Sequence, residues 1–333
     1  VDATDMTGGK VYVTASGVFT EPLADATKAT AAAARFESLT TDTTVTTTAA
    51  FELQVVEDVA PAKPGVNDTL TLDGNNIGWC PVCQADVTWI ALADTSASIA
   101  TVNTEKSHYY LSDNYTYTGT DNAISVTGGD GCLHLNGKTL TASTGTAIMA
   151  KSGYTLNVMG QGSVIGSKDA NWAAAAINVS GAATVKVHSD VAISKATAAT
   201  KAPIIHVSGA NTLVELEGNV TVGASDLVYS TSSSAAITMR NGGTINMENG
   251  TVYGGNNTAG ANGSAVAWYT SANENNVGAF NMTGGTIEAC TVSGCDDYAI
   301  LIGTTYTSVA IGENAVVKPA AMIREDVKGG EQA

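Results

Sequence analysis

One three-part pattern of short apolar runs recurs along the chain, and this repeat constrains the fold more than any other feature. The first run of each repeat begins at Ala123, Ala147, Ala176, Ile204, Ala236, Val266 and Ala299. Successive starts lie 24 to 33 residues apart. A period in this range is typical of solenoid proteins, in which each repeat packs only on its neighbours. The runs are too short for helices, so the repeat predicts a β-solenoid.

The second run of each repeat alternates apolar and polar residues, as expected when successive strand side chains point to opposite faces. Two inward columns are predicted. The first contains Leu133, Leu156, Val185, Val214, Ile245, Phe280 and Val309. The second contains Leu135, Val158, Val187, Leu216, Met247, Met282 and Ile311. Between them, an outward column contains His134, Asn157, Lys186, Glu215, Asn246 and Asn281. With a third run closing each repeat, we expect an all-β fold, a right-handed parallel β-helix of about seven coils.

The repeat also divides the chain. We expect a small β-rich N-terminal module at 1–60, including Thr- and Val-rich strands and a short helix at 24–39. Residues 61–120 would be a linker, a CxxC turn and a lead-in to the solenoid, with "HYYLSDNYTYTG" as its first coil. The β-helix itself would occupy 121–322. A short tail, 323–333, would follow.

Charge and hydropathy limit the partners of such a chain. Its formal net charge is −16 and it has few arginines, so a phosphate backbone would be repelled and nucleic-acid binding is not expected. No apolar stretch approaches the roughly 20 residues that span a bilayer, so no membrane span is predicted. The sequence starts at Val1 without a Met, which favours a secreted protein at the cell surface or outside the cell.

Three segments in order resemble a known family. "WCPVCQADVTW" (79–89), "HYYLSDNYTYTG" (108–119) and "CLHLNGKTLTA" (132–142) are similar to a Cys-rich turn, a "YYL" strand and a "CLdLNGkT" coil in secreted surface proteins of Gram-positive gut bacteria. Those proteins have the pectin-lyase-like right-handed β-helix fold. The resemblance covers about 77–322 and implies the same architecture. It does not select a function, because this superfamily includes lyases, hydrolases, adhesins and structural proteins.

Catalytic candidates are weak, and we expect no catalytic residues and no cofactor. Asp296 and Asp297 form the best acidic pair of the solenoid. Adjacent strand residues face opposite ways, however, so only one of them would reach a shared surface. Lys186 beside Glu215 in the outward column is better explained as an ion pair between coils than as a lyase base. A polysaccharide lyase or glycoside hydrolase remains the alternative.

The five cysteines suggest covalent or metal crosslinks. Cys80 and Cys83 form a CxxC turn, for which a disulfide is the favoured interpretation in an oxidising compartment. The alternative is a zinc site, with Cys132 and His134 as the further ligands if the lead-in folds over the first coil. Cys290 and Cys295 flank a Gly-containing turn and are candidates for a second disulfide. The odd number leaves at least one thiol outside intramolecular pairs.

Two classes of function follow from these observations. The first is a non-catalytic structural protein whose solenoid ends and N-terminal strands join copies head to tail into a homopolymeric filament, because open solenoid ends pair with other strands. The second is a monomeric adhesin, or a protein that binds or cleaves polysaccharides at a cell surface. The absence of a convergent set of catalytic residues and the low charge of the coil faces favour the first.

Overall fold

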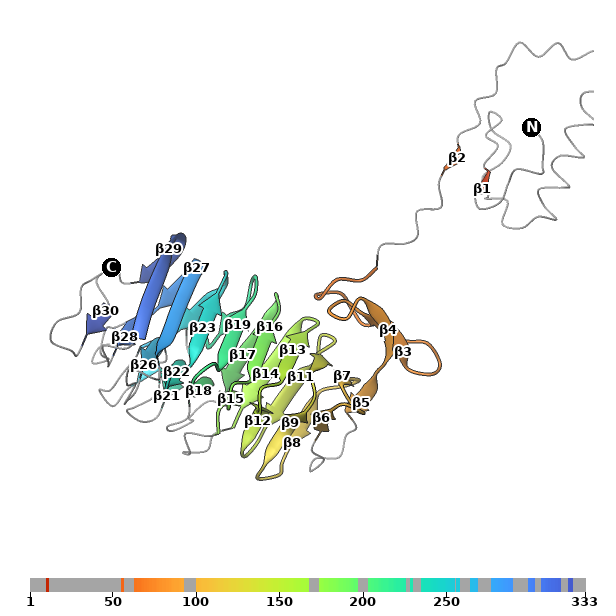
Figure 1. Cartoon of the computed structure of the whole chain (residues 1–333), viewed down its shortest axis with the longest axis horizontal. Coiled ribbons are helices and arrows are strands. Elements are labelled where there is room, and N and C mark those ends of the chain that lie inside the picture. The colour runs from red at the N-terminus through yellow and green to blue at the C-terminus, as the bar shows by residue number, and fades with distance from the viewer. Residues whose placement is uncertain are drawn as a thin grey trace, which may run out of the picture. The chain divides into compact units, whose positions relative to one another are not determined.

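The protein divides into two compact units, Val1–Lys63 and Pro64–Ala333, in the computed structural model (Figure 1). The structure describes residues 10–11, 55–56, 63–92, 100–167, 174–196, 203–225, 228–229, 235–254, 256–257, 264–268, 277–289, 299–302, 307–318 and 323–325. In the first unit, β1 (Lys10–Val11) pairs antiparallel with β2 (Val55–Val56). The predicted helix at 24–39 lies outside the described residues.

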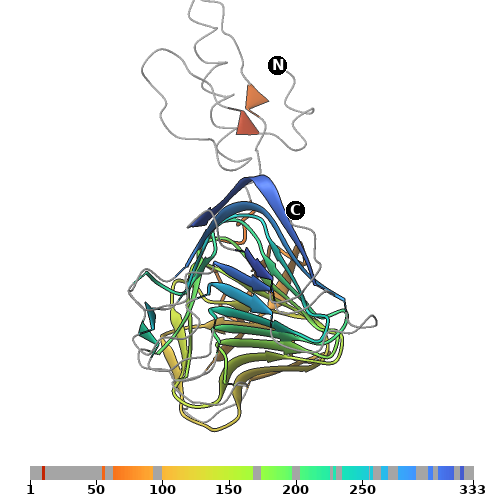
Figure 2. The same ribbon diagram turned by 90° about the vertical axis from the view of Figure 1, so that its left-hand side faces the viewer.

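The second unit is a parallel β-helix, which confirms the predicted fold class: its described residues form strands and no helix. Three parallel stacks run along it and give the three-sided outline seen end-on in Figure 2. The first stack contains β5 (Ile90–Leu92), β7 (His108–Leu111), β10 (Gly131–His134), β13 (Thr155–Met159), β16 (Thr184–Val187), β19 (Leu213–Leu216), β23 (Thr244–Met247), β27 (Gly278–Glu288) and β29 (Thr307–Lys318).

The other two stacks complete each coil. The second contains β8 (Tyr115–Tyr117), β11 (Thr139–Ala142), β14 (Gly162–Gly166), β17 (Val191–Lys195), β20 (Thr221–Val222) and β24 (Thr251–Tyr253), and joins the first through the long strand β27. The third contains β6 (Ala100–Asn103), β9 (Asn122–Gly128), β12 (Thr146–Ala150), β15 (Ile177–Ser180), β18 (Ile205–Ser208), β22 (Ile237–Arg240), β26 (Val266–Trp268), β28 (Ile300–Ile302) and β30 (Ile323–Glu325). Two further short strands, β21 (Val228–Tyr229) and β25 (Asn256–Asn257), form a separate parallel pair.

The predicted inward columns are confirmed from β13 onwards. Leu156 aligns with Val185, and the same column continues through Val214, Ile245 and Phe280. Ile245 is fully buried in the resulting core. One step of the predicted alignment is wrong: Leu133 aligns with Val158, two residues from the predicted partner Leu156. Because strand side chains alternate with a period of two, a shift by two keeps every side chain on its predicted face, and the apolar pattern alone could not detect it.

The outward face of β10 and β13 is covered by residues 64–89. Within this segment β3 (Ile77–Cys80) and β4 (Ala85–Thr88) form an antiparallel hairpin. Its side chains join a small apolar cluster, separate from the main core, made of Cys80, Trp89, Cys132 and Met159 with flanking apolar residues. The lead-in therefore folds over the first coils.

Candidate metal centre

The hairpin β3–β4 presents two cysteines at its tip. Cys80 is the last residue of β3, and the turn Pro81–Gln84 returns the chain to β4. Gln84 has a φ of 52°, a left-handed conformation that tightens this turn. The turn points the amide of Cys83 at the sulfur of Cys80, with N to Sγ 3.4 Å. The two cysteines of the CxxC motif therefore lie close together at the tip of the hairpin.

The solenoid places a histidine and a third cysteine next to this tip. His108 begins β7 and Cys132 lies in β10, and the parallel register places the two residues side by side on neighbouring coils. Both project outward, towards the hairpin. Ser107 Oγ lies 2.9 Å from Nδ1 of His108, which fixes the ring so that Nε2 points to the cysteines.

The four side chains form a compact group. The Sγ atoms of Cys80 and Cys132 are 3.6 Å apart, and Sγ of Cys83 is 3.2 Å from Nε2 of His108. All four donor atoms lie within 4.8 Å of one another. Cys80, Cys83 and Cys132 are free thiols, so the disulfide expected at Cys80 or Cys83 is not formed. The separation of 3.6 Å far exceeds the roughly 2.05 Å of a disulfide bond.

The surroundings exclude water from one side of this group. Cys80 and Cys132 are buried, His108 is half-buried and Cys83 is exposed. Trp89 is buried, donates from Nε1 to the carbonyl of Gly78 at 3.2 Å, and packs its ring edge-on against His108 with centroids 5.2 Å apart. The group therefore has an apolar wall behind it and an open side at Cys83.

Three thiols this close cannot all ionise without a compensating cation. Hydrogen bonding, chiefly from Cys132, lowers the pKa of Cys80 to about 4 against the effect of burial. The pKa of Cys132 is raised well above its ordinary value, first by its hydrogen bond to Cys80 and then by burial. Desolvation and the neighbouring Cys80 raise the pKa of Cys83 to about 11. One thiolate is therefore shared among three sulfurs.

His134, the fourth ligand of the alternative zinc site considered from the sequence, is not part of the group, and His108 lies there in its place. The register aligns Cys132 with His108 and His134 with Tyr110, two pairs further along the strands. The His134 ring instead packs edge-on against the ring of Trp89, with centroids 5.8 Å apart. Burial beneath the 64–89 segment lowers its pKa to about 4. Aligning "HYYL" with "CLHL" as neighbouring coils would have placed His108 beside Cys132 from the sequence alone.

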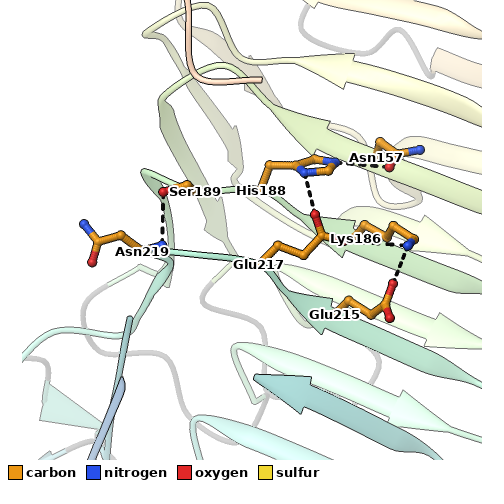
Figure 3. Close-up of polar contacts among 7 residues, drawn as sticks. All are labelled: Asn157, Lys186, His188, Ser189, Glu215, Glu217 and Asn219. Atoms are coloured by element: carbon orange, nitrogen blue, oxygen red, sulfur yellow. Dashed lines mark hydrogen bonds and ion pairs between the residues drawn. The ribbon is translucent and has the colours of Figure 1, made fainter. Parts of the chain in front are cut away.

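A second polar group lies on the outward face further along the solenoid (Figure 3). Lys186 Nζ lies 2.6 Å from Glu215 Oε2 and 3.6 Å from Glu217 Oε1, which confirms the predicted pair between coils. His188 Nδ1 lies 2.8 Å from Glu217 Oε2, and Nε2 lies 3.1 Å from Asn157 Oδ1. Burial lowers the pKa of His188 despite the attraction of Glu217. These groups link three successive coils.

The structure does not describe the remaining candidate residues. Cys290, Cys295, Asp296 and Asp297 lie outside the described residues. Over the described part of the chain, no helix is long and apolar enough to cross a membrane. Comparisons with protein-family models, curated proteins and solved structures gave no match to this chain.

Proposed function

We propose that this protein is a non-catalytic extracellular structural protein, a β-solenoid rod that joins head to tail with further copies. The observation that carries the proposal is the exposure of the apolar inward column at β29. In the preceding coil, Phe280 and Met282 of β27 are each 1% exposed. Ile311 of β29 aligns with Met282 and belongs to the same inward column, yet it is 37% exposed.

The exposure of Ile311 has a simple cause. Each inward side chain is covered by the coils on both of its sides, and β29 has β27 on one side. No strand among the described residues pairs with its other edge. A 12-residue edge strand with an apolar inward column is the kind of edge that accepts a strand from another chain.

The sequence of the N-terminal unit contains a segment whose composition suits this edge. The segment "TTVTTTAAFELQVV" (43–56) is rich in Thr and Val, which favour extended structure. Addition of such a strand from one copy to β29 of the next is a heterologous contact, and a heterologous contact that does not close forms a filament.

The polar groups of the outward face support a structural role. Lys186, His188, Glu215 and Glu217 form ion pairs and hydrogen bonds between coils, as described above. Asn281 Nδ2 likewise donates to Asn246 Oδ1 at 2.9 Å. These polar side chains therefore contact one another between coils.

Two substitutions in β29 test the assembly. Ile311→Lys places a charge in the inward column, whereas Val316→Lys places one on the outward face of the same strand, where Val316 is 45% exposed. We expect Ile311→Lys, and deletion of 1–60, to convert concentration-dependent polymers into monomers in sedimentation velocity, while Val316→Lys still polymerises. A wild-type chain that stays monomeric at high concentration would refute head-to-tail assembly. New reducing or unsaturated ends after incubation with acidic and neutral glycans would refute the non-catalytic role.

A further inference from the structure

We infer that Cys80, Cys83, His108 and Cys132 bind one structural zinc ion that joins the β3–β4 hairpin to the first coils of the solenoid. Three sulfurs and one imidazole nitrogen form one of the usual ligand sets of structural zinc. The inference is independent of the proposed assembly, because it rests on residues at the opposite end of the first stack.

The distances fit a tetrahedral ion. Zinc binds sulfur at about 2.3 Å and nitrogen at about 2.0–2.1 Å, so a tetrahedral site separates two sulfurs by about 3.8 Å and sulfur from nitrogen by about 3.6 Å. The structure has 3.6 Å between the Cys80 and Cys132 sulfurs and 3.2 Å between Cys83 Sγ and His108 Nε2. The remaining donor separations are at most 4.8 Å, which small side-chain rotations would close.

The groups around the ligands suit a metal-bound state. When Nε2 of His108 binds an ion, the ring proton is on Nδ1, and this N–H donates a hydrogen bond to Ser107 Oγ, 2.9 Å away. The amide of Cys83 donates to the Cys80 sulfur at 3.4 Å, and such a bond stabilises a thiolate. A divalent cation among the sulfurs would also allow all three thiols to ionise.

A disulfide explains fewer of these residues. A bond between Cys80 and Cys132 would use two sulfurs and leave Cys83 and His108, 3.2 Å apart, without a role. Zinc uses all four side chains. Because four protein ligands fill the coordination sphere, the site would be structural, with no position for a substrate.

The hairpin gives a reason for such a site. Each of its two strands has four residues, and an isolated two-stranded hairpin is at best marginally stable in water. Two ligands come from the hairpin and two from neighbouring coils, 52 residues apart in the case of Cys80 and Cys132. One ion therefore crosslinks segments that are distant in sequence.

The test measures zinc directly on the full-length chain, which is kept in reductant for the zinc measurements. We expect about one zinc per chain by elemental mass spectrometry, and tetrahedral thiolate absorption bands when cobalt(II) replaces zinc. His108→Gln and Cys83→Ser should each weaken zinc binding by more than about 100-fold in competition with a chelator of known affinity. Removing only the hydrogen-bond partner of a metal ligand weakens binding by about 10- to 100-fold, so losing a ligand itself should cost more.

His134→Gln is the matched control, because His134 lies on the same face two residues from Cys132 and close to Trp89, but outside the group. It should retain wild-type zinc affinity, and chelator should lower the melting temperature of this variant and of wild type. Three results would each overturn the inference: no zinc in the wild-type chain, equal losses in His134→Gln and His108→Gln, or a Cys80–Cys132 disulfide found by peptide mass mapping of chain purified without reductant.

Discussion

Ile245 and Asn246 are adjacent residues of β23 whose substitution by Asp should have very different costs. Ile245 is fully buried, between Val214 and Phe280 in its column. Truncation of a buried Ile to Ala costs about 2–5 kcal/mol, and Asp adds the penalty of an unpaired buried carboxylate. We therefore expect Ile245→Asp to lower the free energy of unfolding by more than about 4 kcal/mol.

Asn246 is on the outward face, where Asp retains the acceptor for Asn281 Nδ2. The new charge lies beside Glu215, its neighbour in the column, and like charges on neighbouring strands cost up to about 1 kcal/mol. Urea unfolding followed by circular dichroism measures both variants. Hydrogen exchange of the neighbouring coils provides a second readout, because solenoids can unfold in parts. Equal losses for the two variants would refute the assigned facing of this strand.

Two further predictions concern polar side chains of the solenoid. Burial lowers the pKa of His206 from 6.5 to about 4. As the pH falls, the unfolded chain therefore takes up the proton first. The free energy of unfolding should decrease by about 3 kcal/mol as the pH falls from about 6.5 to 4. His206→Gln should flatten the unfolding free energy over this window, and an unchanged pH profile would contradict the prediction. Lys186→Met and Glu215→Gln should show a coupling free energy of at most about 1 kcal/mol in a double-mutant cycle, decreasing with salt; a larger, salt-independent value would contradict a surface ion pair.

Much of the solenoid was predictable because its apolar pattern is repeated in every coil. The runs beginning at Ala123, Ala147 and Ala176 fall in or beside β9, β12 and β15. The corners were also predictable, since Asn136 and Gly137 after β10 both adopt positive φ, which Asn and Gly tolerate best. The two-residue error at Leu133 arose because the alternation fixes which face a side chain occupies, whereas turn lengths fix the register.

The candidate metal centre was only partly predictable. Cys80, Cys83 and Cys132 were identified from the CxxC motif, but the fourth ligand depended on register, and His134 was chosen where the structure places His108. The burial of His134 was also missed, because an outward position in a β-helix is normally exposed. Only the packing of residues 64–89 over this face buries it, and no periodic signal marks that segment.

The same outward column has different roles along the solenoid. In the observed register this column contains Cys132 of β10, in place of the predicted His134, and in the next coils Asn157, Lys186 and Glu215. Among the described residues, a second layer of protein covers this column near the hairpin, and there it meets the cysteines of the CxxC turn. The open column at Ile311 lies on β29, which the chain reaches last in this stack. Zinc loss through Cys83→Ser should therefore leave the β29 edge competent for assembly, and Ile311→Lys should leave one zinc per chain. If either substitution abolished both properties, zinc binding and assembly would depend on one another, and the assignment of the two roles to separate ends of the stack would be wrong.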